Sequence, residues 1–76
     1  MIDYKQYIAI NSEIRFGRPT IIGTRITVFD VLNWLANGMS VKEIIEDFPE
    51  LDELDIKACL SYAAQREHDM VSVAAA

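Results

Sequence analysis

From residue 28 onward, apolar residues recur three or four positions apart in three successive stretches, the spacing of short amphipathic helices. The first predicted helix covers residues 28–37, and Gly38 ends it in a left-handed cap. The second covers residues 41–47 and is stopped by Pro49, which cannot continue a helix. The third begins near residue 53 and continues beyond residue 66. The pattern therefore predicts three helices joined by short turns.

Polar residues before each predicted helix support these boundaries. A side chain that can cap the helix is followed three positions later by an acid, as in a capping box: Thr27 and Asp30, Ser40 and Glu43 and, more weakly, Asp52 and Asp55. The predicted core faces are Val28, Val31, Leu32 and Leu35, then Val41, Ile44, Ile45 and Phe48, then Ile56, Cys59, Leu60 and Ala63.

The third predicted helix has apolar or uncharged residues on the side opposite its predicted core face as well: Leu54, Ala58, Ser61, Tyr62 and Gln65. A helix that is apolar nearly all round is usually covered on more than one side. We therefore expect Leu54 and Tyr62 to contact a second subunit or another partner. The alternative is a tightly wrapped monomer in which Tyr62 is half-buried.

The first third of the chain is different in character, because it is rich in Ile and Thr and is punctuated by Gly and Pro. Residues 8–10 and 20–28 have strand-like content, and residues 21–26 suggest either a small hairpin with Gly23 in its turn or a bent edge strand. A two-stranded ribbon this short is unstable alone. It is expected to lie on the helices or to pair with the same segment of a second subunit, which would give a two-fold dimer.

Composition and charge limit the functions that are open. The 76 residues form one domain, divided into a β/loop segment (8–27), a three-helix unit (28–67) and a flexible tail (68–76). Apolar residues make up 51% of the chain, more than a small monomer easily hides. Residues 1–27 carry four basic and two acidic residues, a net +2, whereas residues 28–76 carry three basic and ten acidic ones, a net −7. This division predicts two surfaces for two kinds of partner.

No constellation in the sequence is typical of catalysis. The chain has one His and one Cys, no nucleophile beside a base, no phosphate-binding glycine loop and no Cys/His spacing for zinc. We expect no enzyme activity, no metal and no cofactor. The apolar runs are too short to cross a membrane and the N-terminus lacks a signal core, so a cytoplasmic location is expected.

The second and third predicted helices, with a tight turn between them, have the layout of a helix-turn-helix unit. In that motif the recognition helix presents its N-terminal residues to the DNA major groove. Here that end carries four acids, which repel phosphates: Glu50, Asp52, Glu53 and Asp55. Any contact with DNA is therefore expected elsewhere.

Two stretches, residues 10–19 and Ile22-Gly23-Thr24-Arg25-Ile26-Thr27-Val28, resemble the signature of a family of small bacterial proteins, domain of unknown function family 433. Residues 35–40, 44–51 and 55–64 agree with the same pattern, so the resemblance covers about residues 8 to 67. It implies a mainly α, homeodomain-like helix-turn-helix fold with a short N-terminal β element. It also implies a VapB-like antitoxin of a type II toxin–antitoxin pair, which binds a small PIN-like ribonuclease toxin and, often as a homodimer, represses its own operon.

These considerations lead to two predicted surfaces. A basic one for operator DNA would consist of Arg15, Arg18, Thr24 and Arg25. An acidic one for the toxin would consist of Glu46, Asp47, Glu50 and Glu53, together with Leu54 and Tyr62. Three alternatives stay open: that Arg18 and Arg25 pair with the chain's own acids, that the protein is a stand-alone DNA-binding regulator, and that it is a non-catalytic adaptor.

Overall fold

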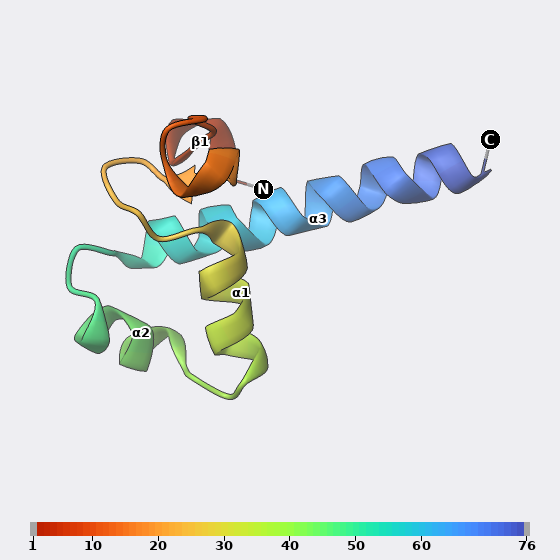
Figure 1. Cartoon of the computed structure of the whole chain (residues 1–76). Coiled ribbons are helices and arrows are strands. Elements are labelled where there is room, and N and C mark those ends of the chain that lie inside the picture. Colours follow the sequence, from red (N-terminus) through yellow and green to blue (C-terminus); the bar gives the residue numbers. More distant parts are fainter. Residues whose placement is uncertain (1, 76) are drawn as a thin grey trace.

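The computed structural model describes residues 2–75, with side chains described as far as Asp69, and confirms a mainly α domain with a small N-terminal sheet (Figure 1). The helices are α1 (Val28–Ala36), α2 (Val41–Asp47) and α3 (Glu53–Ala75). Two short strands, β1 (Ile8–Ala9) and β2 (Thr20–Ile21), alternate with two 3-10 turns that the sequence did not predict, η1 (Tyr4–Gln6) and η2 (Arg15–Gly17). Within residues 2–75, no helix combines the length and apolarity needed to cross a membrane.

The two strands pair with each other inside the chain, so the sheet of the structure does not need a second subunit. β1 and β2 are antiparallel, with Ile8 opposite Ile21 and Ala9 opposite Thr20. The chain then folds back on itself: the Ile21 amide donates to the Ile26 carbonyl at 2.9 Å, and Gly23 lies in the turn with φ of +82°. The predicted hairpin turn at Gly23 is confirmed, but the strands are shorter than predicted.

Local capping fixes where the three helices begin. Thr27 Oγ1 accepts from the Asp30 amide at 2.9 Å, and Asp30 Oδ2 accepts from the Thr27 amide at 3.0 Å. The other two predicted boxes show the same reciprocal pattern, Ser40 with Glu43 and Asp52 with Asp55. All three predicted starts are confirmed because each depends on residues only three positions apart.

The core lies where α1 crosses α3, closed by α2 on one side and by the N-terminal segment on the other (Figure 1). Its buried members are Ile8, Ile21, Val28, Val31, Ile44, Leu51, Ile56, Ala58 and Cys59. A stacked pair of rings, Trp34 and Phe48 with centroids 4.3 Å apart, joins α1 to the end of α2.

Three predicted positions on α3 are wrong. Leu60, predicted to face the core, is 47% exposed, whereas Ala58 and Ser61, predicted to face away, are buried. The reason is that the N-terminal segment packs on α3 beside α1 and moves the buried face around the helix. Ser61 Oγ donates to the Ile2 carbonyl at 2.9 Å, and Tyr4 packs edge-on against Tyr62.

Helix α3 also continues further than predicted, through residues 68–75, which were expected to form a flexible tail. No Gly or Pro follows Pro49 in the sequence, so nothing interrupts the helix. Gln65 Nε2 donates to Asp69 Oδ1 at 3.1 Å, one turn further along the helix. The second half of α3 extends beyond the body of the domain (Figure 1). Ala76 lies outside the described residues.

One arginine joins the N-terminal segment to the first helix. Arg15 Nη1 donates to the Arg25 carbonyl at 3.0 Å and to Asp30 Oδ2 at 3.1 Å. The same carboxylate oxygen accepts from the Thr27 amide, so one charge pair caps α1 and holds two loops against it. Arg15 and Asp30 are both partly shielded from solvent, with side chains 36% and 24% exposed.

Removing this contact should loosen the N-terminal segment. Arg15→Ala and Asp30→Asn should each lower the free energy of unfolding, and a double-mutant cycle should give a coupling of about 1 kcal/mol, at the upper end for a partly exposed pair. Urea titration of the four proteins measures it. Lys57→Ala, which removes the more exposed pair with Glu53, is the matched control and should change stability less. A coupling near zero would show that Arg15 does not hold the fold.

The single cysteine provides a test of the core. Cys59 is fully buried, and burial raises the pKa of its thiol from 9.0 to about 12, with a smaller contribution from the Asp55 carboxylate. A pKa that is higher in the folded state makes stability fall as pH rises from about 9 towards 12, because only the unfolded chain ionises readily there. Urea titrations at pH 8 and pH 10 should therefore show a larger loss of stability for the wild type than for Cys59→Ala. Equal losses in the two proteins would contradict the burial.

Candidate binding surfaces

The turn that follows β2 places two of the four residues predicted to contact DNA. Thr24 Oγ1 donates to the Ile21 carbonyl at 2.9 Å and accepts from the Ile26 amide at 3.0 Å. Its hydroxyl therefore holds the turn together and has little capacity left for a ligand. Arg25, next in the chain, uses only its carbonyl in the network with Arg15, and its side chain is exposed.

The other two predicted DNA-contacting residues lie around η2, and they differ from each other. Arg15 is held by Arg25 and Asp30, whereas Arg18 is exposed. Among residues 2–75, neither Arg18 nor Arg25 forms an ion pair with a carboxylate. The arginine that pairs with a helix is therefore Arg15. The structure leaves Arg18 and Arg25 as the two basic side chains of the predicted set that face solvent without an internal partner among the described residues.

The η2 turn has an unusual backbone. Arg15, Phe16 and Gly17 have φ angles of +48°, +59° and +77°, the left-handed region that only glycine enters without cost. Two backbone hydrogen bonds close the turn, from the Gly17 amide to the Ile14 carbonyl and from the Arg18 amide to the Arg15 carbonyl. The result is that the side chain of Phe16 is 98% exposed.

The predicted acidic surface lies at the end of α2, in the following turn and at the start of α3. All four of its acids are exposed, and Leu54 beside them is 45% exposed: Glu46, Asp47, Glu50 and Glu53. Glu53 Oε1 lies 3.3 Å from Lys57 Nζ, in an exposed pair that holds neither side chain firmly. This segment therefore exposes four carboxylates and one large apolar side chain.

Tyr62 lies apart from that segment, two turns further along α3. Its ring is half-buried and meets Tyr4 edge-on at a centroid distance of 5.2 Å, while the Arg66 guanidinium lies over it at 5.9 Å. The second side of α3 is thus covered here by the chain's own N-terminal segment. The four acids and Leu54 thus share the segment between α2 and α3, and Tyr62 lies outside it.

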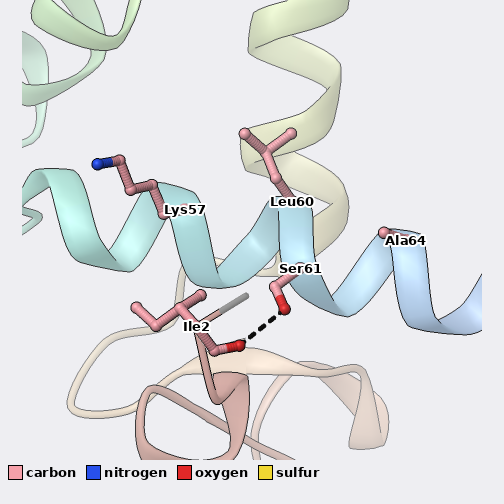
Figure 2. Close-up of a pocket in the computed structure, with 5 residues that line it drawn as sticks. All are labelled: Ile2, Lys57, Leu60, Ser61 and Ala64. Carbon is pink, nitrogen blue, oxygen red and sulfur yellow. Dashed lines mark hydrogen bonds between the residues drawn. The ribbon is translucent and has the colours of Figure 1, made fainter.

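A shallow apolar hollow, which the sequence did not predict, opens on α3 beside Tyr62. It has a volume of about 350 Å³ and is lined by Ile2, Lys57, Leu60, Ser61 and Ala64. Figure 2 shows Ile2 held below the helix by the hydrogen bond from Ser61, with Leu60 and Ala64 along the same stretch of α3. The hollow arises because the N-terminal segment covers α3 only in part.

No cluster of three or more His, Cys, Asp or Glu side chains within residues 2–75 could hold a metal ion. Every buried polar side-chain atom in the described part of the chain has a hydrogen-bond partner. Burial also raises the pKa of the Asp55 carboxyl, whose Oδ2 accepts from the Asp52 amide in the capping box.

Known proteins resemble this chain both in sequence and in fold. An uncharacterized protein, y4eO, from Sinorhizobium fredii (strain NBRC 101917 / NGR234) is 34% identical over 59 residues, covering 78% of this chain. This chain spans 27% of the length of y4eO. The crystal structure of a DUF433 member protein from Anabaena variabilis ATCC 29413 matches with a TM-score of 0.76 at 26% identity, over 91% of this chain and 68% of that one.

The family model described as protein of unknown function (DUF433) matches residues 8–63, from the first strand to the middle of α3. That range includes the three capping boxes, the η2 turn and the four acids of the segment between α2 and α3. On this match, the chain belongs to the DUF433 family.

Proposed function

We propose that this protein is a non-catalytic binding protein, the antitoxin of a type II toxin–antitoxin pair that acts in the cytoplasm as a homodimer. Its partner would be a small PIN-like ribonuclease. One observation carries the proposal: four acids and Leu54 are all exposed on the segment that joins the end of α2 to the start of α3. A ribonuclease binds a polyanion and so needs a basic surface, which this acidic segment complements.

Neutralisation in this proposal works by covering the ribonuclease's RNA-binding face. Carboxylates occupy the positions that phosphates would take, and Leu54 contributes apolar area at the centre of the contact. Helix α3 supports the proposal because it extends past the domain as a rod that can lie along a partner (Figure 1). The proposal includes the class of antitoxin, VapB-like, and the superfamily of the fold, homeodomain-like helix-turn-helix.

Partner capture tests the antitoxin role. The tagged protein, purified from its native host at moderate salt, should retain a small ribonuclease-like protein in stoichiometric amount. Glu50→Lys should weaken that complex about 10-fold, because it places like charges opposite each other. Glu13→Lys, an equally large charge change at an exposed acid in the N-terminal segment, is the control and should leave the complex intact. Equal weakening by both variants, or no protein partner at all, would contradict the proposal.

DNA binding is a second candidate, as autorepression by the antitoxin or as the activity of a stand-alone regulator. The observation that favours it is that Arg18 and Arg25 are exposed and form no ion pair among the described residues. The acidic start of α3 argues against the usual docking of a helix-turn-helix. Any contact would therefore be made by the loops around β2, with phosphates rather than base edges.

Salt dependence tests this candidate. Replacing both Arg18 and Arg25 with Ala should weaken binding to operator DNA and reduce the slope of log K against log salt by about 2 per chain, since each phosphate contact contributes about 0.9. Fluorescence anisotropy over a range of salt concentrations measures both quantities. Lys42→Ala, an exposed cation on α2, serves as the control. If the wild type fails to bind DNA even at low salt, the protein-binding adaptor becomes the better alternative.

A further inference from the structure

Phe16 is the residue that the structure explains least by folding. Its side chain is 98% exposed, so it contributes almost nothing to the core. Its φ of +59° is one that a bulky residue adopts only at a cost of about 1–3 kcal/mol. A residue that does not pack within its own chain and has a strained backbone is a candidate for contact with another molecule.

The loop that carries Phe16 is held firmly. The Arg15 guanidinium fixes the residue before it to Arg25 and Asp30, at 3.0 and 3.1 Å. Two backbone hydrogen bonds close the η2 turn around it. A side chain presented on a fixed turn loses less entropy on binding than one on a mobile loop, which is how an anchoring residue gains affinity.

The local charge favours a protein over a nucleic acid as the molecule that Phe16 contacts. An aromatic wedge into nucleic acid works together with several phosphate contacts. Here Arg15 pairs with Asp30, and of the predicted DNA-binding set only Arg18 and Arg25 remain exposed, in a chain of net charge −5. Phe and Arg are both enriched in protein–protein interfaces relative to the rest of the protein surface.

The chain itself carries a complementary site. The hollow on α3 is mostly apolar, is open to solvent and, at about 350 Å³, is large enough for a phenyl ring (Figure 2). Leu60 in its wall is 47% exposed, so the hollow, like Phe16, leaves apolar surface uncovered. Two carboxylates belong to residues next to its lining: Asp3 follows Ile2 in the chain, and Glu53 pairs with Lys57 at 3.3 Å. Arg18 beside Phe16 has the opposite sign.

We propose that Phe16 of one copy inserts into the α3 hollow of a second copy, with Arg18 directed to the carboxylates at its rim. In a two-fold dimer this contact forms twice, once in each direction. The proposal rests on the homodimer of the proposed function but on neither its toxin nor its DNA. It replaces strand exchange as the origin of the dimer, because the β strands pair within one chain.

Sedimentation velocity over a wide range of concentrations tests the interface. The wild type should dimerise, and Phe16→Ala should weaken the dimer at least about 30-fold, as expected for a hot-spot residue. The midpoint temperature of thermal unfolding of Phe16→Ala, measured in dilute solution, should be no lower than that of the wild type, since Phe16 packs against nothing in the monomer. Ala64→Trp, which fills the hollow from an exposed helix position, should have the same effect on the dimer.

A matched control separates this contact from a general loss of apolar surface. Phe29→Ala removes a phenyl side chain that is 61% exposed, on α1 outside the loop, and should leave the dimer intact. A photoreactive benzoylphenylalanine in place of Phe16 should cross-link to the peptide containing residues 57–64 of the second copy.

Each outcome decides the proposal. A wild type that is monomeric at every concentration overturns both this interface and the homodimer of the proposed function. A dimer that survives Phe16→Ala overturns the interface alone and leaves the homodimer standing. Phe16→Ala that loses DNA affinity while remaining dimeric makes Phe16 a nucleic-acid contact and also overturns the interface. A failure to capture a ribonuclease affects the antitoxin role and leaves this test unchanged.

Discussion

The contact of Arg15 with Asp30 is the constraint on which the N-terminal third of the molecule depends. Two strands of two residues each cannot hold a segment of twenty residues in place. Arg15 reaches the Arg25 carbonyl and the cap of α1 together, across 10 and 15 positions of sequence. Because Asp30 also caps the helix, one carboxylate starts α1 and fixes the loops on both sides of the strand before it. The position of Phe16, the turn at Gly23 and the start of the helical unit all follow from this one cluster.

Features set by neighbours in sequence could be predicted. The three helix starts depend on capping pairs three residues apart, and Gly38 indicated the end of α1 by its position alone. Gly23 likewise indicated its turn. The exposed acids of the α2–α3 segment were also predictable, because the polar face of a short helix and a turn before a helix are both accessible to solvent. Local physical rules were sufficient for these elements.

Features set by contacts between distant residues could not be predicted. The sequence left open a pairing of Arg18 and Arg25 with the chain's own acids, whereas in the structure it is Arg15 that pairs with Asp30. Nothing in the string Ile14-Arg15-Phe16-Gly17 except its glycine indicates a left-handed turn. The exposure of Leu60 and the hollow beside it depend on how the first residues of the chain cross α3, an arrangement that helical periodicity does not contain.

The strained backbone at Phe16 is significant because a chain this small has only a small free energy of unfolding. At roughly 0.05–0.15 kcal/mol per residue, 76 residues provide about 4–11 kcal/mol of stability in total. Left-handed backbone at two non-glycine residues consumes a substantial fraction of that, and the bonds made by Arg15 offset it. Asn or Gly at position 16 would fit the same turn with less strain, because both tolerate positive φ. The fold alone therefore gives no reason for a phenyl ring there, and the reason has to be sought in what that ring contacts outside its own chain.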